Sequence, residues 1–216
     1  ARSGKRPQSR AFTPELWQLL LARADALAEP AGSRMRWLLR FALATGLRPA
    51  ELLAATRGDA YMQDGGWWLR VHGKGARNRA VPIPSSAMVA TRAYFAARDL
   101  RFDSAEPDIP LLAPLGASSL SREHVPYSTI ADYFKRFVAA AVRVSDLSPA
   151  SIAQAERAYL HSLRHTHATR AVEAGVPQDV LQANLGHASP NTTAIYYRAQ
   201  EKRRMAEMER AFSGRD

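Results

Sequence analysis

The sequence predicts a mainly α-helical domain with one small three-stranded antiparallel sheet, an α+β fold. Two observations favour this fold class. Helical spacing of apolar residues, with start and stop signals, recurs along most of the chain, whereas strand-like segments cluster in a single region. The length of 216 residues and the hydrophobic fraction of 46% suit one substantial domain with its own core.

The first part of the chain is expected to form three helices. Thr13 offers a capping hydroxyl and Pro14 suits the first helical position, so a helix is predicted to start there. A second helix is predicted over residues 34–45, with Gly46 as its C-terminal stop. Its inward face is expected to contain Trp37, Leu38, Phe41 and Ala42. A short third helix is predicted to begin near Pro49.

The predicted sheet lies between residues 60 and 83. Residues 67–71 and 79–83 have the composition of strands, and a glycine-rich turn at residues 73–78 separates them. An earlier strand over residues 60–63 is expected to complete a sheet of three antiparallel strands. Lys74 therefore falls at the tip of a predicted hairpin.

Helices are expected again after the sheet, interrupted by a proline-rich loop. The loop covers residues 103–127 and is long enough to be functional or mobile. The remaining helices are predicted over residues 86–100, 128–144, 161–174, 178–184 and 190–198. A charged tail follows, with Met205, Met208 and Phe212 along one face.

The chain is strongly basic, with a formal net charge of +10, and its charges are segregated. Residues 65–98, 161–172 and 181–200 contain no acidic residue. Charge alone does not distinguish nucleic acid from an anionic membrane as a partner. Segregation of this kind, however, predicts a basic face that neutralises the phosphates of a nucleic acid.

The composition also limits the chemistry and the location. The chain has no cysteine, which excludes disulfides, thiolate chemistry and cysteine-based metal sites. This fits a reducing compartment, so a cytoplasmic location is expected. No apolar run approaches the roughly 18 residues that a membrane span needs, and no membrane partner is expected.

His161 and Arg164 are the first candidate pair for chemistry. Residues three apart lie on one face of a helix, so the two side chains can converge on one point. The planar fork of arginine matches two phosphate oxygens, and histidine exchanges a proton near neutral pH. A histidine and an arginine at this spacing are, taken alone, more often two surface residues.

Four further residues stand in conspicuous places. Arg48 lies at a tight helix-to-helix junction, where pairing with Glu51 would brace the turn. Lys74 is flanked by glycines and would, as a structural residue, be a solvated turn charge. His187 follows Leu-Gly, where it would cap a helix, and Tyr196 belongs to a segment whose tyrosines would ordinarily be core or rim residues.

The ordered set of motifs says more than its members. Gly-Leu-Arg-Pro-Ala-Glu-Leu, a Gly-Lys-Gly hairpin, His-Ser-Leu-Arg-His, Leu-Gly-His and a final tyrosine follow one another between about residues 12 and 198. In this order they resemble the tyrosine recombinase (phage integrase) family. The resemblance implies the family's catalytic-domain fold and site-specific DNA recombination or integration, as in mobile elements. Six residues match the family's catalytic positions: Arg48, Lys74, His161, Arg164, His187 and Tyr196.

The resemblance also implies a mechanism without a metal or another cofactor. The two arginines and His187 would stabilise the charge on the phosphate under attack. A free tyrosine has a pKa of about 10, so nearby cations must favour its phenolate, and His161 could help to take its proton. Lys74 would protonate the departing 5′ oxygen, leaving a 3′-phosphotyrosyl bond that retains the energy for rejoining.

Tyr196 and Tyr197 compete for the role of nucleophile. Neighbouring helical residues point about 100° apart, so one of them is expected to face the phosphate. Spacing from His187 and the Thr-x-x-Tyr pattern that begins at Thr193 both favour Tyr196. Further contacts to double-stranded DNA are expected from Arg70, Arg77, Arg79 and Arg198. His165 and His167 are interpreted as structural or supporting residues.

The predicted organisation has three parts. Residues 1–11 are interpreted as the remnant of a basic linker, residues 12–198 as the catalytic domain, and residues 199–216 as a tail or docking helix. The resemblance implies a DNA-clamping domain ahead of the catalytic one, so weak, salt-sensitive DNA binding is expected of this chain alone. For the full-length protein it implies a homo-tetramer on DNA and a nucleoid-associated location.

Two alternatives to a recombinase stay open at this point. A type IB topoisomerase would relax DNA by the same chemistry without exchanging partners, and synapsis of two DNA sites would distinguish them. A non-catalytic DNA-binding module could use the same scaffold, but such a scaffold has no need of all six matched residues.

Overall fold

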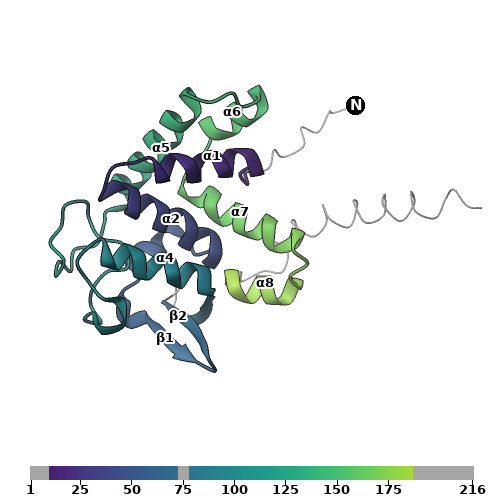
Figure 1. The fold of residues 1–216 in the computed structure, drawn as a ribbon. Helices are drawn as coiled ribbons and strands as arrows, with labels where there is room; N and C mark the ends of the chain where they lie inside the picture. Colours follow the sequence, from purple (N-terminus) through teal and green to yellow (C-terminus); the bar gives the residue numbers. More distant parts are fainter. Residues whose placement is uncertain (1–9, 73–77, 187–216) are drawn as a thin grey trace, which may run out of the picture.

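The computed structural model describes residues 10–72 and 78–186, and Figure 1 shows their arrangement. Helices and one three-stranded antiparallel sheet make up this part of the chain, so the predicted fold class is confirmed. The helices are α1 (Pro14–Asp25), α2 (Ala31–Thr45), α3 (Pro49–Ala54), α4 (Ser85–Ala96), α5 (Tyr127–Arg143), α6 (Pro149–Glu156), α7 (Leu160–Glu173) and α8 (Gln178–Leu185). Two short 3-10 helices are η1 (Arg57–Asp59) and η2 (Phe102–Ser104).

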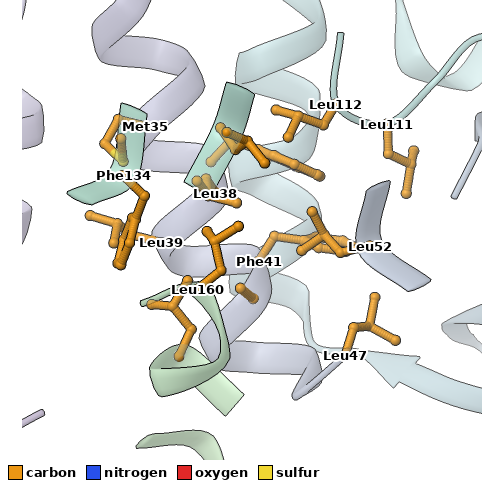
Figure 2. Close-up of a cluster of buried hydrophobic side chains, with 14 of the residues drawn as sticks. Met35, Leu38, Leu39, Phe41, Leu47, Leu52, Leu111, Leu112, Phe134 and Leu160 are labelled. Atoms are coloured by element: carbon orange, nitrogen blue, oxygen red, sulfur yellow. The ribbon is translucent and has the colours of Figure 1, made fainter. Parts of the chain in front are cut away.

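Helix α2 lies at the centre, in contact with α1, α4, α7 and the sheet (Figure 1). Its buried face confirms the predicted inward residues, which are 0–4% exposed. The indole of Trp37 stacks on Phe41 with ring centroids 4.8 Å apart, and its Nε1 donates to Thr91 Oγ1 at 3.0 Å. Figure 2 shows the same core from α2 towards Phe134 and Leu52. This packing fixes the point at which α2 ends, beside the candidate site.

The sheet has the order β1-β2-β3. Its strands are β1 (Ala60–Gln63), β2 (Gly66–His72) and β3 (Asn78–Ile83), which confirms the three predicted strands. Alternate side chains such as Leu69 and Val81, which are partners across β2 and β3, are buried on the core face. Arg70 of β2 is exposed on the opposite face, as period-two alternation requires.

The segment that enters α1 is fixed to helices α6 and α7. The amide of Phe12 donates to Thr166 Oγ1 of α7 at 2.9 Å in a buried position. The side chain of Gln154 in α6 donates to the carbonyl of Ala11, and Arg10 Nη1 donates to the hydroxyl of Tyr159 at 2.9 Å. Residues 10–13 therefore bring the start of the domain against α6 and α7.

Two helix predictions need correction. Helix α6 was not predicted; its buried residues Ser151 and Ala155 are small, so the segment shows no apolar stripe. Helix α2 begins at Ala31, three residues before the predicted start. The prediction began too late because the first turn of the helix lacks large apolar side chains. The predicted helix at residues 190–198 lies outside the described residues.

The connection between α4 and α5 also differs in detail from the prediction. Helix α4 ends at Ala96, before a turn in which the amide of Leu100 donates to the carbonyl of Phe95. The proline-rich loop beyond η2 contributes to the core through Leu111 and Leu112 (Figure 2). The amide of Leu111 donates to the carbonyl of Ala55 at 2.9 Å, so the loop is anchored to the residue that follows α3.

Candidate active site

Three of the six predicted catalytic residues lie in the described part of the chain. They are Arg48, which precedes α3, and His161 and Arg164, which lie on α7. Lys74, His187 and the competing residues Tyr196 and Tyr197 lie outside the described residues, as do Arg77 and Arg198. The roles assigned to all six stay predictions, and the geometry below concerns the described three.

The site is organised around the C-terminus of α8. Arg79 Nε donates to the carbonyl of Asn184 at 2.9 Å, Arg164 Nη2 to that of Leu185 at 2.6 Å, and Arg48 Nη2 to that of Gly186 at 3.0 Å. The last carbonyls of a helix have no partner within the helix, and here three successive ones each receive a guanidinium. The partial negative charge of a helix C-terminus favours cations, which offsets the repulsion between these arginines.

Arg164 connects the ends of two helices. Its Nη1 donates to the carbonyl of Gly46 at 2.7 Å, where α2 ends, and its Nη2 binds the end of α8. The residue is 4% exposed. Burial of a guanidinium is tolerated when its nitrogens find oxygen partners. Arg164 therefore fixes α2, α7 and α8 relative to one another at the candidate site.

Glu51 connects Arg48 to the sheet. Its Oε1 accepts from Nη1 of both Arg48 and Arg79, at 2.8 Å each. Its Oε2 accepts from Arg79 Nη2 and from the backbone amide of Arg48, also at 2.8 Å. Burial alone would raise the pKa of Glu51, but the hydrogen bonds from the two arginines outweigh it and lower the pKa to about 2. The ion pair expected to brace the turn is confirmed, and Arg79 is an additional partner.

His161 is held in an aromatic cluster at the start of α7. Its ring stacks on Tyr159 with centroids 6.2 Å apart and meets His165 edge-on at 5.0 Å. Desolvation lowers the pKa of His161, and the positive charges of Arg164 and Arg48 lower it further. The imidazole is therefore neutral at neutral pH, the state in which it can accept a proton.

His167 has a structural position, as predicted. Its Nδ1 and the carbonyl of Leu43 are 2.7 Å apart, and its Nε2 lies 3.1 Å from Nδ2 of Asn184. The carbonyl accepts, so Nδ1 carries the proton and Nε2 accepts from Asn184. The amide Nδ2 of Asn184 also donates to the carbonyl of Thr45 at 3.2 Å. These bonds hold α8 against the end of α2.

The two described candidates for DNA contact have different surroundings. Arg70 is exposed, with its guanidinium 5.4 Å from the centre of the Tyr61 ring. The Arg79 side chain is 13% exposed, and its guanidinium is engaged with Glu51 and Asn184. The DNA contacts of both stay predictions. The inward bonds of Arg79 were not foreseen, because Asn184 lies 105 residues away in the sequence.

Within residues 10–72 and 78–186, no three histidine or carboxylate side chains lie close enough together to hold a metal ion. No helix in the same part of the chain has the length and apolar character needed to cross a membrane.

The chain is similar to the phage integrase family and to proteins named as tyrosine recombinases. The profile of the phage integrase family matches residues 10–203. Tyrosine recombinase XerD of Rhizobium meliloti (strain 1021) is 32% identical over 191 residues, which cover 85% of this chain and 55% of that protein. XerD of Caulobacter vibrioides is 31% identical, over 88% of this chain and 58% of that protein. The chain thus spans little more than half the length of these relatives.

Solved structures share the fold. XerH recombinase bound to difH substrate matches with a TM-score of 0.63 and 22% identity, over 87% of this chain and 50% of that one. The catalytic domain of bacteriophage HP1 integrase matches with a TM-score of 0.55 and 22% identity, over 87% of each chain. On the profile match across most of its length, this chain belongs to the phage integrase family.

Proposed function

We propose that the chain is the catalytic domain of a site-specific DNA recombinase, which breaks and rejoins DNA through a tyrosine. Family membership and the names of the relatives support this proposal. One structural observation carries it. Arg48 and Arg164, which are 116 positions apart in the numbering, both bind the last carbonyls of α8, directly ahead of His187.

In the proposed reaction the Tyr196 oxygen attacks a backbone phosphorus. The P–O5′ bond breaks as the P–O(Tyr) bond forms, which leaves a 3′-phosphotyrosyl link and a 5′-hydroxyl. The tyrosine proton passes to His161, and Lys74 supplies a proton to the departing oxygen. Attack by a 5′-hydroxyl reverses these steps, so the cycle consumes neither ATP nor a cofactor.

Two of the described side chains suit their proposed roles, His161 as the proton acceptor and Arg48 as a donor that stabilises the charge on the phosphate. The neutral state of His161 at neutral pH makes it a proton acceptor. The Arg48 side chain is 39% exposed and so accessible to a phosphate. Its hydrogen bonds to Glu51 and to the carbonyl of Gly186 fix its orientation. Donors fixed before the charge develops stabilise a transition state without further rearrangement.

Partners and assembly form the second part of the proposal. Double-stranded DNA is the substrate, consistent with the net charge of +10 and its segregation along the chain. Residues 12–198 form the catalytic domain, and residues 199–216 dock on this or a neighbouring protomer. The full-length protein carries a DNA-clamping domain, acts as a homo-tetramer on DNA and is associated with the nucleoid.

Covalent trapping tests the reaction. The protein would be incubated with a pool of nicked duplexes prepared from genomic DNA of the source organism. Where a nick lies close to the cleaved phosphate, the short released strand diffuses away, so the covalent product cannot rejoin. A covalent protein–DNA band should appear on denaturing electrophoresis, in EDTA as well as without it. No band under any condition would overturn the proposed chemistry, and a band that EDTA abolishes would overturn the metal-free mechanism. Sequencing the trapped DNA would identify the target.

Strand exchange separates a recombinase from a topoisomerase. Two duplexes of different length that carry the trapped target would be mixed with the protein. Products of exchanged length are expected of a recombinase. Relaxation of a supercoiled plasmid without exchanged products would favour the topoisomerase, which has the same chemistry.

A further inference from the structure

We propose that Arg79 of β3 is a positioning residue for DNA cleavage, acting through Glu51 on Arg48 while the end of α8 holds its guanidinium. The inference rests on the proposed function, since it concerns how the same site is aligned. It differs from the sequence prediction, in which Arg79 was one of several DNA contacts.

The first step is the fit between Arg79 and Glu51. Both terminal nitrogens of Arg79 donate to the carboxylate, one to each oxygen and each at 2.8 Å. A planar guanidinium fixes both the position and the plane of a carboxylate in this paired arrangement. Arg48 binds the same two oxygens with Nη1 and its backbone amide. Arg79 therefore determines where the partner of Arg48 lies.

The second step concerns the end of α8. Arg79 Nε donates to the carbonyl of Asn184, so one guanidinium contacts both the start of α3 and the end of α8. Gly186 adopts a positive φ of 61°, and a β-carbon there would lie 2.9 Å from Cδ of Arg79. The side chain of Arg79 thus runs directly against the residue that precedes His187.

The third step is burial. The side chains of Arg79 and Glu51 are 13% and 8% exposed, whereas that of Arg48 is 39% exposed. Nε, Nη1 and Nη2 of Arg79 all donate within the protein. Arg79 thus occupies the inner side of the shared carboxylate and Arg48 the outer side.

Lysine cannot reproduce this arrangement, because an ammonium group lacks the planar fork that reaches three oxygens at once. Arg79→Lys keeps the charge and removes the alignment. Arg92→Lys is the matched control: Arg92 of α4 binds Asp103 of η2 through Nε and Nη2 at 3.0 and 2.8 Å, and both side chains are exposed.

The experiment separates cleavage from binding and from folding. Single-turnover cleavage of the trapped duplex would give a rate constant and an amplitude, and DNA titration would give a Kd and its salt slope. For Arg79→Lys we expect the rate constant to fall on the order of 100-fold, as for a small misplacement of reacting groups. The Kd and salt slope should be unchanged, and Arg92→Lys should match the wild type. A merely structural role would lower the amplitude, which counts folded molecules, and leave the rate constant intact.

A pair of variants keeps the test valid if Arg79→Lys does not fold. Arg79→Met combined with Glu51→Gln leaves no unpaired buried charge, and it is compared with Glu51→Gln alone. If Arg79 acts through Glu51, the double variant should cleave no slower than Glu51→Gln. A double variant that cleaves more slowly than Glu51→Gln would show that Arg79 acts independently of Glu51 and would overturn the inference.

Two other results would also overturn it. A wild-type rate constant in Arg79→Lys would show that the alignment is not needed. A weaker Kd with a shallower salt slope in Arg79→Met Glu51→Gln than in Glu51→Gln would mark Arg79 as a phosphate contact. Absence of cleavage by the wild-type protein is a different failure, because it removes the proposed function itself.

Discussion

Gly46 lies against the ring of His167, so closely that a β-carbon on Gly46 would stand 2.4 Å from Cδ2 of the imidazole. Gly46 ends α2 with a φ of 64°, and its carbonyl oxygen accepts a hydrogen bond from Nη1 of Arg164. His167 is held in turn by bonds to Leu43 and Asn184. A side chain at position 46 would therefore displace a residue that joins α2, α7 and α8.

Gly46→Ala is expected to lower the free energy of unfolding more than Gly65→Ala. Both positions have a positive φ, which costs an alanine about 1–2 kcal/mol. Space is open around Gly65, with no atom within 4 Å of an added β-carbon, so the backbone effect acts there alone. Urea unfolding of both variants gives the comparison. Equal losses would show that His167 moves aside freely.

The protein should lose stability as the pH falls from about 6.5 towards 4. Burial lowers the pKa of His165 from 6.5 to about 4, and nearby His161, Arg10 and Arg164 contribute. In this window the unfolded chain binds a proton that the folded chain does not, so acid favours unfolding. Urea unfolding at several pH values should show a shallower loss for His165→Gln.

Tyr196→Phe should abolish the covalent protein–DNA band, and Tyr197→Phe should retain it. Each substitution removes one phenolic hydroxyl, and the two residues are neighbours, so each variant is the control for the other. Only the hydroxyl that faces the phosphate can form the phosphotyrosyl bond. The reverse pattern would reassign the nucleophile to Tyr197.

Arg70→Gln should weaken DNA binding uniformly across sequences. An exposed arginine that neutralises one phosphate contributes about 0.9 to the slope of log K against log salt. Arg70 is exposed beside Tyr61 on the outer face of the sheet. Titrations at several salt concentrations should therefore give a slope smaller by about 0.9. Arg92→Gln makes the same charge change on α4, and an equal decrease there would indicate a general effect of net charge.

Much of the fold follows from local signals in the sequence. Thr13 and Pro14 start α1 with the predicted cap, since Thr13 accepts a hydrogen bond from the amide of Leu16. Helix α6 was not predicted, because no apolar stripe follows its start, but Ser148 and Pro149 give it a similar signal. Capping chemistry was thus more informative here than hydrophobic periodicity.

The candidate site was predictable where partners are close in sequence. Arg48 and Glu51 are three residues apart, and their ion pair is present as expected. The partnership of Arg79 with Glu51 spans 28 residues, and that with Asn184 spans 105. Such pairs depend on how α3, β3 and α8 pack together, which a single sequence does not specify.

The bond between the amide of Phe12 and Thr166 provides an internal probe of the domain. This N–H is buried and donates to a hydroxyl of α7, outside any helix or strand ladder. Its proton can exchange with deuterium only when the entering segment separates from α7, so its exchange rate measures that opening event. Because the acceptor is two residues from Arg164, the same rate would report, without any label, how often the candidate site loses its support from the start of the domain.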